Sequence, residues 1–451
     1  MLLILSDLHF TDESTAVNVN PEAFDLLSGF ALDTMTRRKV KELHVVLLGD
    51  IFDLVRSAAW LETCPRDERP WNGVPNPRTG VNAHPAVAGH FSRVLAAILS
   101  APSTTHFVTT LGLLRQRAAQ GGIPFRVTYV AGNHDRALFN FPDLIRQVTA
   151  VLPEVTRPAH AFESSAYSLL GRHGHEWDEH CHGYRFRNKV LVPGEKVDRF
   201  APEAYEVMAI GEVITAELMG GIIVGAARHG ADAGFLAELK DLNNLRPMTA
   251  VFAWLEWLGA ERVIGDREIL LKALHDALDG VLESRLARQW DKLVPDTLLK
   301  ADLTDRLQQV RALLLGTSFD TFRKRVGTVE KLLEFAALFS RNRDTLLEGA
   351  KKERVFQGPI GDKGTQYVVY GHTHRARTDY VSGRPDGRVR MYLNAGTYLP
   401  LIARAEDFKT FGRSTQMTLS YFFREDEDTD RKVPGTVSAD TWYGIRRKLY
   451  V

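Results

Sequence analysis

The stretch "FRVTYVAGNHD" (residues 125–135) joins a strand-like apolar run to a cluster of polar side chains. β-Branched and aromatic residues favour a strand, and Gly132 favours a turn at its end. Asn133, His134 and Asp135 follow at once, and each is costly to bury without a partner. The stretch is therefore either a polar turn or a strand end that holds a metal and a proton donor. The other strand ends in the sequence bear on this choice.

Four other strand-like runs also lead into histidine and aspartate. The runs span residues 2–5, 44–48, 166–170 and 365–370. The side chains that follow them are Asp7 and His9, then Asp50 and Asp53, then His173 and His175, and finally His372 and His374. Ligand sites in open α/β sheets lie beyond the carboxyl ends of the strands. We therefore expect all five polar groups to converge on one place.

The alternation of strands and helices predicts the fold class. Residues 21–43 have a helix-like apolar spacing and lie between two strand-like runs. A strand, a helix and a strand at this spacing are typical of parallel strands in an α/β domain. Strand-like sequence returns at 388–395 and 416–423, whereas long helical patterns dominate from about 185 to 360. We predict an α/β core that is interrupted by a large α-helical insertion.

The predicted domain boundaries follow from these changes. The core comprises residues 1–184 and 361–423, the insertion comprises 185–360, and a C-terminal tail comprises 424–451. The tail opens with the acidic run "REDEDTD", which is typical of an exposed segment.

The insertion begins just after His173 and ends just before His372, so it emerges beside the predicted site. Its helices carry a wide apolar face that includes Phe252, Trp254, Trp257 and Leu258. This face either lines a substrate pocket, which would make the insertion a cap, or packs as an ordinary structural layer.

The composition excludes some classes of protein. The 451 residues include 57 basic and 56 acidic side chains, a net charge of +1. No bulk positive field therefore indicates a nucleic-acid partner, although a local patch is not excluded. Two cysteines, Cys64 and Cys181, are too few for a disulfide framework and fit a reducing compartment. The first residues lack the features of a secretory signal, so we expect a cytoplasmic protein.

The most apolar later stretch, residues 207–227, is interrupted by Glu212 and Glu217. It contains no uninterrupted apolar run long enough to span a bilayer. We interpret it as a core helix and expect no transmembrane segment.

The five polar groups together indicate a metal centre. Burying so many imidazoles and carboxylates is costly unless a metal pair compensates for it. Carboxylate, imidazole and amide donors without a thiolate suit two divalent ions of Mn²⁺, Fe²⁺ or Zn²⁺, with Mn²⁺ favoured, more than a structural zinc site.

The phrases "SDLHF", "GDIFDL", "GNHD", "HGHEWD" and "GHTH" resemble the calcineurin-like metallophosphoesterase superfamily. The resemblance covers roughly residues 1–180 and 362–423, and all five motifs are intact. The wording is closest to the bacterial branch of UDP-2,3-diacylglucosamine pyrophosphate hydrolases. The insertion is longer than in that branch, and His134 stands where that branch typically has arginine. The resemblance implies a two-layer β-sandwich flanked by helices.

The resemblance also implies roles for individual residues. The first metal would be bound by Asp7, His9 and His374, the second by Asn133, His173 and His372, and Asp50 would bridge the two. His134 would be the catalytic proton donor to the leaving group, and Asp135 would orient it.

The implied activity is metal-dependent hydrolysis of a phosphodiester or pyrophosphate bond by a metal-bridging hydroxide. The substrate would be a phosphate-containing small molecule or a lipid-linked molecule. A phosphomonoesterase, including a protein phosphatase, or a nuclease would use the same core. A non-catalytic scaffold of this fold is the alternative from another class.

Some residues near the motifs have two interpretations. His175 is an alternative ligand to His173. The "HCH" sequence at 180–182 resembles a zinc motif, but a second Cys/His pair at finger spacing is missing. Asp53 is expected to cap a helix start or to accept a hydrogen bond from a ligand.

Three further residues are weaker candidates for the site. Arg136 is either a phosphate contact or a solvated side chain, and Asn394 is a candidate for the pocket floor. In the Pro- and Gly-rich loop 61–85, Arg69 and Trp71 either contact a substrate or pack against the core.

Overall fold

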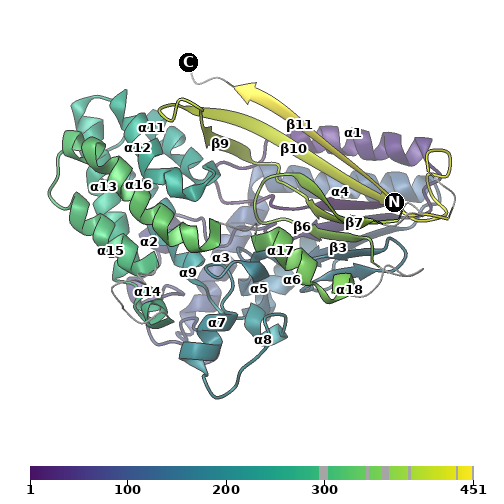
Figure 1. Cartoon of the computed structure of the whole chain (residues 1–451), viewed down its shortest axis with the longest axis horizontal. Helices are drawn as coiled ribbons and strands as arrows, with labels where there is room; N and C mark the ends of the chain where they lie inside the picture. Colours follow the sequence, from purple (N-terminus) through teal and green to yellow (C-terminus); the bar gives the residue numbers. More distant parts are fainter. Residues whose placement is uncertain (294–302, 342–344, 358–364, 384–387, 433–434, 449–451) are drawn as a thin grey trace.

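The computed structural model describes residues 1–448 except for 294–302, 342–344, 358–364, 384–387 and 433–434. Within these residues the chain is an α/β protein with two mixed sheets and many helices (Figure 1). The predicted fold class is confirmed at this level.

The first sheet has the strand order β11-β10-β1-β2-β3, with β9 paired to β10. Its strands are β1 (Leu2–Leu5), β2 (Leu43–Leu48), β3 (Phe125–Val130), β9 (Pro400–Arg404), β10 (Phe411–Phe423) and β11 (Ser438–Lys448). Strands β1, β2 and β3 are parallel, as the strand–helix–strand pattern predicts. Their carboxyl ends therefore point to one edge of the sheet.

The second sheet has the order β4-β5-β6-β8-β7. Its strands are β4 (Phe162–Ser164), β5 (Leu169–Gly171), β6 (Tyr367–Tyr370), β7 (Arg377–Gly383) and β8 (Val389–Asn394). Strands β5, β6 and β8 are parallel, and β4 and β7 are antiparallel edge strands.

The two sheets face each other because their strands alternate between two hydrophobic layers. In β1, Leu2 and Ile4 join Val46 from β2 and Val369 from β6 in a cluster between the sheets. The alternate residues Leu3 and Leu5 point to the opposite side, into the main helical core. The period of two therefore gives each strand one face for the partner sheet and one for helices.

Helices cover the outer faces of both sheets. The first sheet packs against α1 (Glu22–Arg37), α3 (Ala86–Ser100), α4 (Pro102–Gln120) and α6 (Pro142–Val151), which share its hydrophobic cluster. The second sheet is covered by α17 (Thr345–Lys352) and α18 (Arg354–Gln357), whose Leu346, Ala350 and Phe356 pack with Val368 and Tyr370. Short helices α2 (Ala59–Glu62) and α5 (Ala137–Asn140) follow β2 and β3.

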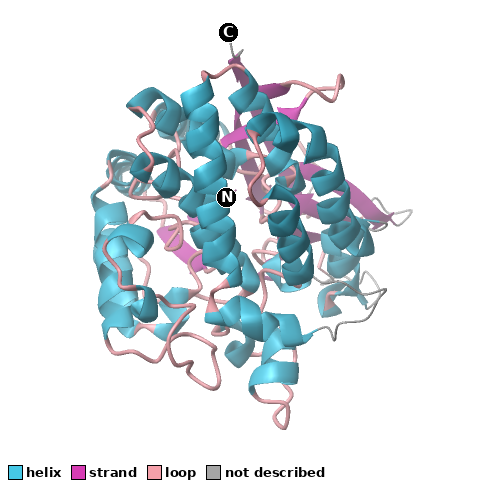
Figure 2. Cartoon of the chain, turned by 90° about the vertical axis from the view of Figure 1, so that its left-hand side faces the viewer, coloured by secondary structure: helices cyan, strands magenta, loops and turns pink. Residues whose placement is uncertain are grey.

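The insertion is helical, as predicted, and lies beside the sheets on the left of Figure 1. Figure 2, which views that side, shows its helices in front of the strands. They are α7 (Tyr184–Phe186), α8 (Pro202–Tyr205), α9 (Ile210–Val213), α10 (Gly221–Arg228), α11 (Ala233–Leu239), α12 (Val251–Ala260), α13 (Ile264–Leu282), α14 (Arg285–Trp290), α15 (Leu303–Leu314) and α16 (Phe319–Arg341).

The apolar face of the insertion packs as a structural layer, which was one of the two alternatives that the sequence left open. Phe252, Trp254 and Leu258 are buried in the same hydrophobic cluster as the first sheet. The ring of Trp257 packs at a tilt of 49° against that of Phe411 of β10, with ring centroids 5.6 Å apart. The insertion therefore shares one core with the α/β part.

The apolar stretch near residue 207 packs as a core segment. The described residues contain one helical stretch long and apolar enough to cross a membrane, Pro202–Arg228, and 83% of its apolar window is buried inside the protein. Its two acidic side chains are both paired. Glu212 accepts from Arg136 at 2.7 and 2.8 Å, and Glu217 accepts from Trp71 at 2.6 Å and from Arg69 at 2.9 Å. Arg69, Trp71 and Arg136 thus join the insertion to the core.

The prediction of a C-terminal tail is wrong. Residues 438–448 form β11, which pairs antiparallel with β10. The acidic run is not fully exposed either, because Glu427 accepts hydrogen bonds from the backbone N–H groups of Lys41 (2.8 Å) and Arg424 (3.1 Å). Asp428 pairs with Arg38. Local charge therefore gave a misleading signal about a segment that lies against the sheet.

Candidate metal centre

The five polar groups lie together at the carboxyl ends of the strands. Asp7 and His9 follow β1, Asp50 follows β2, Asn133 and His134 follow β3, His173 follows β5, and His372 and His374 follow β6. Among the described residues, four sets of donor atoms have all their members within 4.8 Å of one another, and three of them come from these groups: Asp7, His9 and His374; His9, Asp50 and His134; Asp50, His173 and His372. His9 and Asp50 each belong to two sets, so the sets are contiguous.

The backbone at these positions is unusual. Asp7, His9, Asp50, His372 and His374 all have positive φ, between 44° and 70°. Non-glycine residues rarely adopt this conformation, and strain of this kind clusters at functional sites. The turns therefore hold the side chains in positions that ordinary strand ends would not give them.

The glycines of the motifs allow the close approach of these turns. A Cβ on Gly132 would lie 2.6 Å from the backbone nitrogen of Asp50 and 2.8 Å from the His173 ring. A Cβ on Gly49 would lie 2.7 Å from the His173 Cβ, and one on Gly371 would overlap the carboxylate of Asp7. Glycine is needed here because neighbouring loops fill the space.

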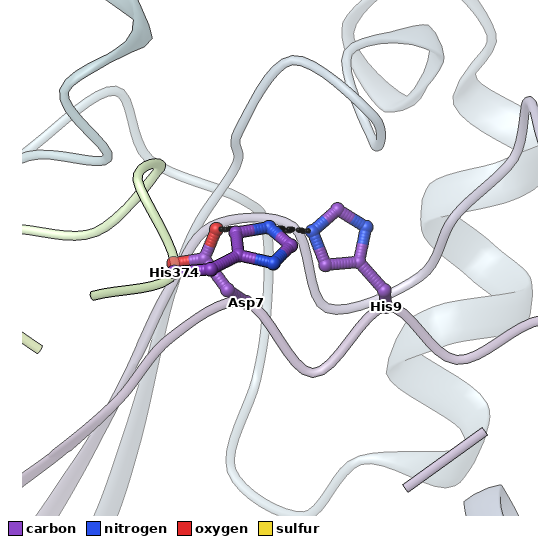
Figure 3. Close-up of side chains that lie close together, drawn as sticks. All are labelled: Asp7, His9 and His374. Carbon is purple, nitrogen blue, oxygen red and sulfur yellow. Dashed lines mark hydrogen bonds and ion pairs between the residues drawn. The ribbon is translucent and has the colours of Figure 1, made fainter. Parts of the chain in front are cut away.

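The first set is compact. His9 Nε2 lies 3.0 Å from His374 Nε2, and Asp7 Oδ1 lies 3.4 Å from His374 Nε2 and 3.7 Å from His9 Nε2. Figure 3 shows the three side chains turned toward one another. Two imidazole nitrogens and a carboxylate oxygen at these separations form a donor set suited to a divalent cation.

The second set is joined to the first through Asp50. Its Oδ2 lies 3.0 Å from His173 Nε2 and 3.6 Å from His9 Nε2. Its Oδ1 accepts a hydrogen bond of 2.8 Å from the backbone N–H of His134. Burial favours the protonated acid, but His173 and then His134 hold the pKa of Asp50 well below its usual range. One oxygen of this ionised carboxylate thus faces both sets.

Two buried atoms support the fit to a metal. Asn133 Oδ1 is buried without a hydrogen-bond partner, and His173 Nε2 is buried 3.0 Å from the Asp50 carboxylate. His173 Nδ1 donates to the carbonyl of Leu48 at 3.0 Å, so Nε2 is the ring nitrogen that faces Asp50. Unpaired buried acceptors are rare in folded proteins, and metal coordination is one way to satisfy them. The amide, imidazole and carboxylate groups therefore fit the expected ions.

His173, rather than His175, belongs to the set. The ring of His175 lies 5.3 Å from that of His173, centroid to centroid, and its Nδ1 is 3.7 Å from Glu176. Burial holds the pKa of His175 well below its ordinary value. Among the described residues, none of the compact donor sets contains His175.

The expected role of Asp135 in orienting His134 is wrong. Asp135 accepts from the backbone N–H groups of Ile51 (3.0 Å) and Gly132 and from the Tyr129 hydroxyl (2.6 Å). It therefore ties its own loop to the loop after β2.

Asp53 is the carboxylate that contacts His134. Its Oδ2 lies 3.0 Å from His134 Nδ1 and 2.8 Å from His9 Nδ1. Burial alone would lower the pKa of His134, but Asp53 and Asp50 outweigh it and raise that pKa. Asp53 also accepts from the backbone N–H groups of Val55 (3.2 Å) and Arg56 (3.1 Å), which holds a turn and does not cap a helix start, since the next helix, α2, begins at Ala59. Asp53 serves two predicted site residues at once.

Asp178 and Arg246 also lie at the site, and sequence reasoning missed both. Asp178 Oδ2 lies 3.2 Å from His372 Nε2. A proton on Nε2 that is donated to Asp178 leaves the lone pair of His372 on Nδ1, and carboxylates often orient metal-binding histidines in this way. Arg246 Nη2 lies 2.7 Å from His374 Nδ1. Burial, reinforced by Arg56, lowers the pKa of Arg246 to about 9.

The remaining candidates have mainly structural contacts. Cys181 lies with Asp178 and His372, whereas His182 donates to the Arg199 carbonyl (2.8 Å), so "HCH" does not assemble as one zinc set. Asn394 donates to the carbonyl of Gly371 at 2.6 Å and thereby holds the loop after β6.

No family model, curated protein or solved structure matches this chain.

Proposed function

We propose that this protein is a metal-dependent phosphoesterase of the calcineurin-like superfamily, with two adjacent divalent ions that are Mn²⁺, Fe²⁺ or Zn²⁺. The observation that carries the proposal is the position of Asp50 Oδ2, 3.0 Å from His173 Nε2 and 3.6 Å from His9 Nε2. A carboxylate oxygen that faces two donor sets is the arrangement that a dinuclear centre requires. The positive φ values at five of the proposed ligands support the same function.

The proposed ligands follow from the donor sets. Asp7, His9 and His374 would hold one ion, His173 and His372 the other, and Asp50 would contact both. Asn133 is added to the second set because its Oδ1 is buried without a hydrogen-bond partner. Two such ions would polarise a phosphoryl group and lower the pKa of an attacking water. They bring four positive charges, and Asp7 and Asp50 return two. The site therefore favours an anionic phosphate over a neutral ester.

His134 is the proposed proton donor. Asp53 contacts its Nδ1 at 3.0 Å, which leaves Nε2 as the nitrogen that delivers a proton to a leaving group. Asp53 and Asp50 raise its pKa against the effect of burial, and this favours the protonated ring. The side chain is 11% exposed, so it is accessible from the outside of the site.

The proposed reaction is hydrolysis of a phosphodiester or pyrophosphate bond in a small or lipid-linked molecule. The test compares turnover of bis(4-nitrophenyl) phosphate and 4-nitrophenyl phosphate by the manganese-loaded protein. Faster turnover of the diester supports the proposal, and faster turnover of the monoester would make the protein a phosphomonoesterase.

A matched pair of variants ties the activity to this site. His173→Ala should abolish turnover, whereas His160→Ala, which alters a histidine outside all the donor sets of the described residues, should not. If neither substrate is hydrolysed by any metal-loaded form, and a panel of nucleotides and sugar nucleotides is also untouched, the protein is a non-catalytic relative of this fold.

A further inference from the structure

Arg246 comes from the insertion but reaches the candidate metal centre. It lies between the short helical segments Lys240–Asn244 and Met248–Ala250. Its backbone N–H donates to the Ile402 carbonyl of β9 at 2.8 Å, and the preceding Leu245 is buried and forms a β-bridge with Ile402. This anchor fixes the backbone of the insertion at the edge of the first sheet.

The guanidinium is held from one side only. Nη1 donates to the carbonyls of Asn243 (3.1 Å) and Leu245 (2.7 Å), both on its own loop. Nη2 faces the centre, 2.7 Å from Nδ1 and 3.1 Å from Nε2 of His374. One half of the side chain thus anchors it, and the other half is presented to the site.

Arg246 differs from the other arginines that join the insertion to the core. Arg136 pairs with Glu212 at 2.7 Å, and Arg69 pairs with Glu217 at 2.9 Å. Within the part of the chain that the structure describes, Arg246 has no carboxylate within ion-pair distance. A part-buried cation without an ion-pair partner is costly, and the more distant Asp7 and Asp50 carboxylates offset that cost only in part, so an anionic ligand would stabilise this arrangement.

Two neighbouring arginines are less suited to this role. Arg56 is buried, and its Nε already pairs with Asp53 at 3.1 Å. Arg375 is exposed, and its Nη2 donates to the Arg246 carbonyl at 3.4 Å. Both add positive charge near Arg246, but among the hydrogen bonds of the described residues only Arg246 places an arginine donor against His374.

We propose that Arg246 binds a non-bridging oxygen of the substrate's phosphate, so that the insertion contributes directly to substrate binding. The inference rests on the proposed function for the identity of the substrate. The chemistry needs only a tetrahedral oxyanion, because a planar guanidinium donates well to phosphate oxygens. Arg246 would then act on the phosphate from the side of the first metal set.

The test measures binding of inorganic phosphate to the manganese-loaded full chain by calorimetry. Arg246→Gln should weaken phosphate binding about 10- to 100-fold, the range expected for losing a charge-assisted hydrogen bond. Arg246→Lys, which keeps the charge without the planar donors, should fall between that variant and the parent. The matched control Arg375→Gln removes a neighbouring exposed arginine and should change binding less than threefold.

The outcomes separate this inference from a structural role. Unchanged phosphate affinity in Arg246→Gln would overturn it, and so would loss of bound manganese in that variant, because Arg246 would then serve to hold His374. If the chain hydrolyses no phosphate ester but binds phosphate through Arg246, the proposed function fails and the anion site remains. If hydrolysis is found and phosphate binding ignores Arg246, only the inference fails.

Discussion

Asp53→Asn tests whether the carboxylate that orients His134 is Asp53, which contacts its ring in the structure, or Asp135, which follows it in the sequence. Asp53 Oδ2 lies 3.0 Å from His134 Nδ1 and 2.8 Å from His9 Nδ1. Its Oδ1 accepts from two backbone N–H groups, those of Val55 and Arg56. An asparagine that keeps the backbone bonds must turn its NH₂ group toward both histidines, so both lose their acceptor.

The expected magnitude follows from these two contacts. A hydrogen bond to a charged group contributes about 1.5–3 kcal/mol. Loss of the hydrogen bond to His9 should weaken metal binding by about 10- to 100-fold. This effect disappears at saturating metal. Loss of the hydrogen bond to His134 still acts at saturating metal and corresponds to a decrease of about 10- to 150-fold in kcat.

The assay is kcat at saturating Mn²⁺ for two diesters, one with a good aryl leaving group and one with a poor alkyl leaving group. The decrease should be larger for the poor leaving group, because that reaction depends more on proton donation. Asp135→Asn is the comparator, since Asp135 contacts Ile51, Gly132 and Tyr129 and should mainly affect stability. Equal kcat for Asp53→Asn and the parent on the poor leaving group would refute the reasoning.

Three other substitutions have expected outcomes. Asp50→Ala should lower the content of both metals, measured by elemental analysis, and retention of two ions per chain would contradict a shared ligand. Gly132→Ala should destabilise the protein by about 1–3 kcal/mol in chemical denaturation, because its Cβ would lie 2.6 Å from Asp50 N. The control Gly112→Ala on α4, where a Cβ would have nothing within 4 Å, should be neutral or stabilising. Burial lowers the pKa of His44 from 6.5 to about 4. As the pH falls, the unfolded state therefore takes up a proton at a higher pH than the folded state, and the protein loses stability between pH 6.5 and pH 4. His44→Gln should remove about 1–2 kcal/mol of that loss, after discounting for partial exposure, and an unchanged pH dependence would contradict it.

The convergence of the motifs was predictable from the sequence because it depends on local patterns. Each motif follows a short apolar run, and parallel strands bring their carboxyl ends to one edge. Asp7, Asp50 and His173 therefore came together as expected. The α/β class and the helical insertion were predictable for the same reason, since both depend on periodicity within one segment.

The contacts between distant segments were not predictable. Asp178 and His372 are 194 residues apart, and Arg246 and His374 are 128 residues apart. The first pair depends on how the two parts of the core meet, and the second depends on how the insertion docks; no local pattern encodes either. Asp135 shows the opposite error, because a neighbour in sequence was taken as a neighbour of the His134 ring. Its turn directs the carboxylate back to Gly132 and Ile51 instead.

The central claim is that two metal ions bind side by side and share Asp50. Anomalous diffraction from crystals of the manganese-loaded protein tests it most directly. The proposal predicts two peaks about 3.5–4 Å apart, one beside His9 and His374, one beside Asn133 and His173, and both in contact with Asp50. A single peak, or peaks away from Asp50, would contradict the dinuclear centre.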